Sequence, residues 1–126
     1  MPQYQSKEEV YEVIGRLAAN LQADEKLKSR LPRTDISVGF TLTDLGAEFT
    51  LKLSRDQMSA APGVPSECPI SVSLTSSTFD QIFSGQRDAE SAYMYGLLSL
   101  RGSEYRAEQL LPYMPDIVAA YKAATA

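Results

Sequence analysis

The sequence contains no histidine and a single cysteine, Cys68, among its 126 residues. Without histidine, the chain lacks the usual general base of serine and cysteine hydrolases and the commonest metal ligand. A single cysteine can form neither an intramolecular disulfide nor a cysteine-rich zinc site, and it fits most easily in a reducing compartment. We therefore expect no metal site and no cofactor, and we expect Cys68 to be a packed structural residue.

Long apolar runs and clusters of basic residues are also missing. No uninterrupted apolar stretch approaches the roughly 20 residues that span a bilayer, and residues 1–10 are too polar for a signal peptide. The net charge is −4, with the basic residues scattered among acids, a pattern that suits neither nucleic acid nor anionic lipid. The C-terminal Ala124-Thr125-Ala126 is not a peroxisomal address of the Ser-Lys-Leu type. These features predict a soluble, cytoplasmic protein with no stable membrane insertion and no nucleic-acid partner.

The carboxylates do not suggest a catalytic set. Asp44 is placed as a turn residue, and Asp80 and Asp88 stand where helices begin. Glu104 and Glu108 form a like-charged i, i+4 pair that we expect to face water. Acid–base catalysis needs convergent groups with perturbed pKa values, and no glycine-rich phosphate loop is present either. We predict a protein that is not an enzyme and has no catalytic residues.

The N-terminal half is predicted to contain a helical region followed by a β-hairpin. Ser6 and Glu9 stand at capping-box spacing and open a helix whose second part, residues 24–31, ends at Pro32. Its apolar stripe is Val10, Ile14, Leu17 and Leu21. Strict alternation over residues 36–42 and 47–53 then predicts two antiparallel strands joined at Asp44-Leu45-Gly46, with one wet sheet face. Residues 57–60 could form a short edge strand.

The C-terminal half changes periodicity several times. Residues 70–74 alternate as a strand, and Ser77 and Asp80 have capping-box spacing for a helix that stops at Ser84-Gly85. A second helix is predicted over residues 88–95, a strand over residues 96–102 and a further helix over residues 103–111. Pro112 and Pro115 should then divide the last helical region.

This order of parts resembles the sterol carrier protein 2 family, in which a helix of the form F-D-x-x-F-x-G precedes a strand of the form G-K-L-K-I-K-G. The counterparts here are residues 79–85 (FDQIFSG) and residues 96–102 (GLLSLRG), followed by the apolar Ala107 and Leu110. The resemblance implies a single α+β domain over residues 1–126. We expect a five-stranded, mostly antiparallel sheet with helices on one face enclosing an apolar tunnel. It also implies non-catalytic binding and transfer or presentation of a lipid, such as a sterol, fatty acid, acyl-CoA or isoprenoid.

Large apolar side chains of the C-terminal half are the candidate ligand-binding residues. Flexible Met and amphipathic Tyr suit a pocket that adapts to its ligand. The predicted lining is Phe79, Ile82, Phe83, Tyr93, Met94, Leu98, Leu110, Leu111, Met114, Ile117, Val118 and Tyr121.

Two other interpretations stay open. One is a non-enzymatic interaction subunit of a lipid or quinone biosynthetic assembly, and the other is an accessory domain of a hydrolase acting on alkyl substrates. The chain also departs from the family pattern, because Leu97 and Ser99 stand at lysine positions and Gln86 replaces a lysine. We therefore hypothesise contact with a protein, a second copy included, through the strand bearing Leu97, in place of docking on acidic bilayers.

Overall fold

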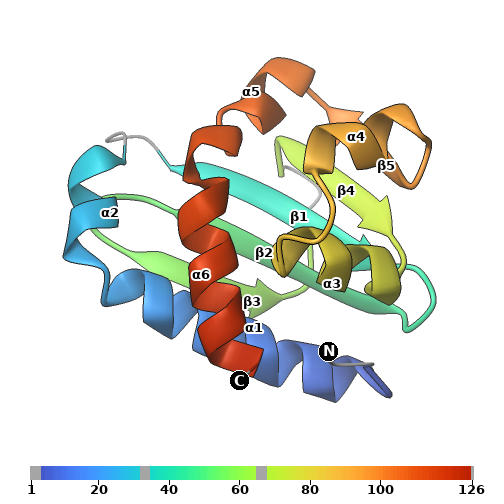
Figure 1. Cartoon of the computed structure of the whole chain (residues 1–126), viewed down its shortest axis with the longest axis horizontal. Coiled ribbons are helices and arrows are strands. Elements are labelled where there is room, and N and C mark those ends of the chain that lie inside the picture. Colours follow the sequence, from blue (N-terminus) through green and yellow to red (C-terminus); the bar gives the residue numbers. More distant parts are fainter. Residues whose placement is uncertain (1–3, 32–34, 65–67, 126) are drawn as a thin grey trace.

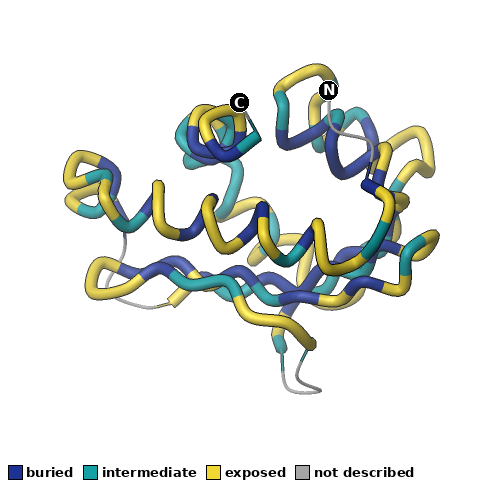
Figure 2. Tube along the Cα trace, turned by 90° about the horizontal axis from the view of Figure 1, so that it is seen from below, coloured by how far each residue is buried: buried dark blue, intermediate teal, exposed yellow. Residues whose placement is uncertain are grey.

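The computed structural model describes residues 4–31, 35–64 and 68–125, which form a five-stranded sheet covered by helices (Figure 1). The elements in chain order are α1 (Lys7–Gln22), α2 (Glu25–Arg30), β1 (Ile36–Leu42), β2 (Ala47–Leu53), β3 (Met58–Pro62), β4 (Ile70–Leu74), α3 (Ser76–Phe83), α4 (Ala89–Met94), β5 (Leu98–Gly102), α5 (Glu104–Glu108), the 3₁₀ helix η1 (Leu111–Tyr113) and α6 (Met114–Thr125). The helices lie on one face of the sheet (Figure 2). The predicted α+β fold is confirmed.

The sheet has the strand order β3-β2-β1-β4-β5. Neighbouring strands are antiparallel except for β1 and β4, which run parallel. The short strand β3 lies at an edge, as predicted, and continues to Pro62, where an edge position tolerates the missing N–H group. The parallel pair requires a connection that crosses the sheet between β3 and β4, so the mostly antiparallel sheet is a mixed one.

The N-terminal helices begin where side chains cap them. Ser6 accepts a hydrogen bond from the Glu9 amide at 3.4 Å, and Asp24 caps α2 by accepting from the Leu27 amide at 3.1 Å. The predicted apolar stripe of α1 is buried, and the helix packs against α6 and β3. Pro32, expected to end this helical region, lies outside the described residues.

The start of α3 differs from the sequence prediction. Thr75, and not Ser77, is the N-cap residue, and its side chain accepts from the Thr78 amide. The helix starts early because the Asp44 carboxylate accepts hydrogen bonds from the Ser76 amide at 2.9 Å and from the Ser76 hydroxyl at 2.7 Å. A residue distant in sequence therefore sets the helix start, which a local capping pattern does not reveal.

The later elements follow the predicted order. Asp88 caps α4 by accepting from the Ser91 amide, and Ser103 caps α5 by accepting from the Arg106 amide. The predicted helix over residues 103–111 is shorter than expected, since α5 ends at Glu108. Pro112 lies in η1 and Pro115 in the first turn of α6, so the prolines do divide the last helical region.

An aromatic cluster forms the centre of the core beneath α3 and α6. Phe79 is fully buried, with its ring centroid 4.4 Å from that of Phe83 and 5.7 Å from that of Tyr121. Phe40 and Phe49 stack across the β1–β2 pair at 5.1 Å. These rings fill the space between the centre of the sheet and α6.

Among the described residues, no helix is long and apolar enough to cross a membrane.

Candidate functional site

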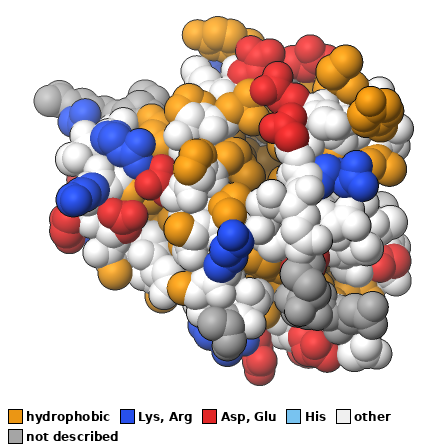
Figure 3. All heavy atoms as spheres, in the orientation of Figure 1, with side chains coloured by type: hydrophobic (Ala, Val, Ile, Leu, Met, Phe, Trp, Pro, Cys, Tyr) orange, Lys and Arg blue, Asp and Glu red, His pale blue; other side chains and the backbone are white. Residues whose placement is uncertain are grey.

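A pocket of about 310 Å³ lies between the sheet and the helical layer, on the side covered by α4 and α5. It borders the aromatic cluster at Phe40 and Phe83, and it opens to the surface in a hollow lined by apolar side chains (Figure 3). Its volume is at the small end of the range for ligand pockets, about 300 to 1,000 Å³. The predicted apolar tunnel between sheet and helices corresponds to this open pocket.

Three neighbouring strands form the floor of the pocket. Alternate residues of a strand point to the same face, and here the face toward the helices supplies Val38, Phe40, Val72, Leu74, Leu98 and Leu100. On β5, Ser99 and Arg101 point the other way and are exposed. The period-2 pattern that predicted these strands is therefore the reason why the floor is apolar.

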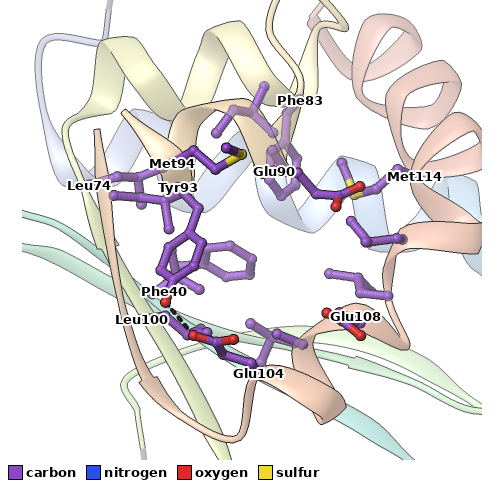
Figure 4. A pocket seen from close by; sticks show the side chains of 18 residues that line it. Phe40, Leu74, Phe83, Glu90, Tyr93, Met94, Leu100, Glu104, Glu108 and Met114 are labelled. Atoms are coloured by element: carbon purple, nitrogen blue, oxygen red, sulfur yellow. Dashed lines mark hydrogen bonds between the residues drawn. The ribbon is translucent and has the colours of Figure 1, made fainter. Parts of the chain in front are cut away.

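The walls come from the helices. They are the end of α3, one side of α4 and α5, and the turn that leads into α6 (Figure 4). The predicted ligand-binding residues that line the pocket are Ile82, Phe83, Tyr93, Met94, Leu98, Leu110, Leu111 and Met114. Met94 and Tyr93 are among the exposed large hydrophobic residues, so they lie where the pocket meets solvent.

Four predicted ligand-binding residues do not line the pocket. Phe79, Ile117 and Tyr121 are fully buried in the core. Val118 packs instead beside Gly85, where a Cβ atom would stand 3.1 Å from its Cγ1. The reason is the direction of α6, which after Met114 runs across the sheet (Figure 1) and brings Tyr121 against Phe79 and Phe83, so only its first residue reaches the pocket.

Apart from Leu98, sequence reasoning missed the floor of the pocket, and it also missed the charged residues of the lining. The floor residues on β1 and β4 had a usable signal, because their alternation already placed them on the helix-facing side. Glu90, Glu104 and Glu108 also line the pocket, although the last two were expected only to face water. They are exposed as expected, but they lie at its opening, and the sequence carries no signal for that convergence.

One polar contact joins two walls of the pocket. The Tyr93 hydroxyl of α4 donates a hydrogen bond to the Glu104 carboxylate of α5 (Figure 4). This hydrogen bond, together with the negative charge of Glu104, raises the pKa of Tyr93 above its ordinary value. The phenol therefore stays protonated at neutral pH, and its only proton is already committed to Glu104.

A second polar group is buried in the core and not in the pocket. Asp80, expected as a helix-start residue, is only 4% exposed, and its carboxylate accepts a hydrogen bond from the Tyr121 hydroxyl at 2.7 Å. The hydroxyls of Tyr4 and Tyr121 are 2.5 Å apart. Burial raises the pKa of Tyr4 to about 12 and also raises the pKa of Tyr121. These contacts tie the N-terminal segment, α3 and α6 together.

Cys68 makes a local contact. Its thiol donates a hydrogen bond to the Ile70 carbonyl at 3.2 Å, and the side chain is half-buried. Within residues 4–31, 35–64 and 68–125, no group of three or more His, Cys, Asp or Glu side chains is arranged to hold a metal ion. The apolar pocket is therefore the candidate site.

The sequence matches a known protein family over most of its length. The family model described as "SCP-2 sterol transfer family" matches residues 15–111. No curated protein matches the sequence.

Solved structures with the same fold share little sequence with this chain. The possible sterol carrier protein TT1886 from Thermus thermophilus has 17% identity and a TM-score of 0.63, over 93% of this chain and 87% of the other. The ubiquinone synthesis protein UbiJ-SCP2 has 16% identity and a TM-score of 0.61, over 98% of this chain and 97% of the other.

A third similar structure is a much larger protein. The stereoselective inverting sec-alkylsulfatase Pisa1 from Pseudomonas sp. has 23% identity and a TM-score of 0.59 over 74% of this chain. The match covers only 14% of the sulfatase chain. These identities show a shared fold.

Proposed function

The chain belongs to the SCP-2 sterol transfer family, and from that membership we propose that it binds the apolar part of a lipid in the pocket beside α4 and α5, without catalysis, for transfer or presentation. A sterol, fatty acid, acyl-CoA or isoprenoid chain would be held by contact with the floor residues of β1, β4 and β5. The domain would cover residues 1–126 and act in the cytoplasm.

The observation that carries the proposal is the composition of the pocket lining. Apart from Tyr93 and three glutamates, every side chain in it is aliphatic, Phe or Met. Burial of apolar ligand surface contributes about 25 cal/mol per Å², or about 0.8 kcal/mol for each methylene group. A chain of several methylene groups would therefore gain enough free energy to bind with no covalent link.

The two methionines of the lining suit a carrier that must also release its ligand. Met94 and Met114 lie on different sides of the pocket (Figure 4), and methionine side chains change rotamer easily to fit different apolar shapes. Tyr93 presents a ring to the pocket and a hydroxyl to its edge (Figure 4). We expect the ligand's head to lie at this edge and its chain to lie along the sheet.

Two measurements test the proposal. Native mass spectrometry of protein purified from cells should show a co-purifying lipid. The neutral dye Nile red should bind to the purified protein, and long-chain amphiphiles should displace it without turnover and with no effect of a chelator. If neither the dye nor any fatty acid, alcohol, sterol or isoprenoid binds, the proposal is wrong.

A second candidate function is protein interaction. The full-length similarity to UbiJ-SCP2, named as a ubiquinone synthesis protein, favours it, as do the exposed Met94, Tyr95 and Leu97 at the α4–β5 turn. If this candidate is correct, the chain is a non-enzymatic subunit of a lipid or quinone biosynthetic assembly. A protein partner in place of a lipid in the mass spectrum would support it.

A further alternative is an accessory domain of a hydrolase that acts on alkyl substrates. The similarity to the sulfatase favours this alternative, and the same measurement would detect such an enzyme as the partner.

A further inference from the structure

The charged residues that line the pocket all have the same sign. Glu90 lies on α4, and Glu104 and Glu108 lie on successive turns of α5. Among the described residues of the lining, none is Lys or Arg. Figure 3 shows acidic side chains gathered beside the hollow, next to its apolar surface.

The carboxylates are arranged around the opening of the pocket. In Figure 4, Glu90 and Glu108 lie on the side of Met114, and Glu104 lies opposite, against the Tyr93 hydroxyl. The ion pairs found in the described part of the chain involve Lys28, Arg30 and Lys52, and none of them includes a pocket glutamate. Among the described residues, none of these three carboxylates is therefore in contact with a basic side chain.

Hydrogen-bond donors are equally scarce there. The lining contains no Ser, Thr, Asn or Gln among its described side chains, so the Tyr93 hydroxyl is the one side-chain O–H or N–H group in it. That hydroxyl already donates to Glu104. A phenol has one proton, so Tyr93 can offer an incoming ligand only its lone pairs. The side chains at the opening thus present acceptors and negative charge.

From the side chains at this opening we propose that the pocket prefers single-chain amphiphiles whose head donates hydrogen bonds, a protonated amine first and an alcohol second, and that it binds carboxylate and phosphate heads more weakly. The inference rests on the proposed function, since the apolar pocket supplies the affinity for the chain. It adds that the head group is selected by Glu90, Glu104 and Glu108. An anionic head would meet three like charges with no side-chain donor to stabilise it.

The size of the preference follows from the exposure of the glutamates. All three are exposed, so each charge is well solvated and contributes little compared with a buried ion pair. Exposed pairs contribute up to roughly fivefold each in an equilibrium constant. We therefore expect the amine to bind about tenfold more tightly than the carboxylate of equal chain length, with the alcohol between them.

The test uses three competitors that differ only in the head group. Dodecylamine, dodecanol and dodecanoate are titrated against Nile red bound to the full chain at neutral pH, in low salt and again in high salt. The expected order of displacement is amine, alcohol, carboxylate, and the amine-to-carboxylate ratio should shrink in high salt, which screens the charges. Equal displacement by all three, or strongest displacement by dodecanoate, overturns the inference and leaves the proposed function standing. If none of them binds, and the dye, sterols and isoprenoids do not bind either, the proposed function itself fails; if only the three dodecyl compounds fail, the inference alone is overturned.

Two double variants test whether the glutamates at the opening cause the preference for the amine. The double variant Glu90→Gln/Glu108→Gln should weaken dodecylamine binding about fivefold and dodecanol binding clearly less, because a neutral alcohol loses no charge interaction. The matched control is Glu8→Gln/Glu12→Gln, which removes the same charge from exposed positions on α1. It should change neither competitor. If the control variant weakens dodecylamine binding as much as the pocket variant does, the effect is one of net charge, and the assignment to the opening is wrong.

Discussion

The Tyr121 hydroxyl donates a hydrogen bond to the Asp80 carboxylate at 2.7 Å, inside the core and across 41 positions of sequence. Because the single phenolic proton of Tyr121 is used there, the 2.5 Å contact with Tyr4 must be donated by Tyr4. The result is a directed chain from the N-terminal segment through α6 to α3. It holds α6 in the position that sends only Met114 to the pocket.

This chain predicts unequal effects of two similar variants. Tyr121→Phe removes the donor to Asp80 and leaves a buried carboxylate without it, which should cost about 2 to 3 kcal/mol of unfolding free energy. Tyr4→Phe removes only a bond to a neutral phenol and should cost about 1 kcal/mol. Urea denaturation measures both values. Equal losses in the two variants would contradict the direction assigned to the chain.

Alkaline pH should weaken the fold through the same tyrosines. Burial raises the pKa of Tyr4 to about 12, and it also raises the pKa of Tyr121. In the unfolded chain, a tyrosine has its ordinary pKa of 10.0. The folded state therefore holds its phenolic protons longer, so this stabilisation is complete below pH 10 and is lost as the pH rises above it.

Denaturation curves between pH 8 and 12 measure the effect. Tyr4→Phe should flatten the loss of stability on the alkaline side. Tyr105→Phe is the matched control, because this tyrosine is exposed, and it should leave the pH dependence unchanged. A Tyr4 variant with the same alkaline profile as the unmodified protein would refute the role of Tyr4.

The two ends of the first turn of α6 should respond differently to a charge. Met114 lines the pocket and is partly exposed, whereas Ile117 is fully buried. Met114→Asp should keep the fold and weaken Nile red binding at least tenfold, because the apolar wall gains an ionised group. Ile117→Asp should destabilise the protein by at least about 3 kcal/mol. Circular dichroism melts and dye titrations distinguish the outcomes, and a folded Ile117→Asp protein without dye binding would show that the pocket boundary is misplaced.

The two glycines that frame β5 should also differ. Gly102 has a φ of +107°, and a Cβ atom there would stand 2.1 Å from the Pro69 carbonyl oxygen. Gly96 has a φ of +75°, and a Cβ atom added there would meet only open space. We expect Gly96→Ala to cost about 1 to 2 kcal/mol from backbone conformation alone, and Gly102→Ala to cost clearly more because the backbone must move as well. Thermal denaturation tests this order, and a smaller loss for Gly102→Ala would be inconsistent with the close approach to Pro69.

The exposed leucine at the α4–β5 turn gives a test of protein contact. Leu97 is 38% exposed, while Leu98 and Leu100 line the pocket as the alternation predicted. The predicted strand over residues 96–102 begins only at Leu98, so Leu97 lies in the turn before β5. If this turn contacts a second copy, light scattering should show a mass above the monomer for the unmodified protein and the monomer mass for Leu97→Lys. Neither protein should co-sediment with anionic vesicles. A monomer mass in both proteins, or strong salt-sensitive vesicle binding, would count against this contact.

Local patterns were sufficient for most of the fold. Alternation at residues 36–42 and 47–53 predicted the hairpin because a strand with one buried face needs an apolar residue at every second position. Ser6 and Asp88 predicted helix starts because a capping side chain bonds to an amide only three residues away. The family pattern of residues 79–85 and 96–102 then predicted the family and its fold, and both predictions are confirmed.

Only the tertiary structure decided which apolar residues form the pocket and which form the core. Met114, Ile117 and Tyr121 were all predicted to bind the ligand, but the path of α6 across the sheet sends the first to the pocket and buries the other two. Likewise, Glu90 and Glu104 converge because β5 brings α4 and α5 together (Figure 4). A sequence pattern defines the face of one element, whereas the neighbour that covers this face is set by packing between elements distant along the chain.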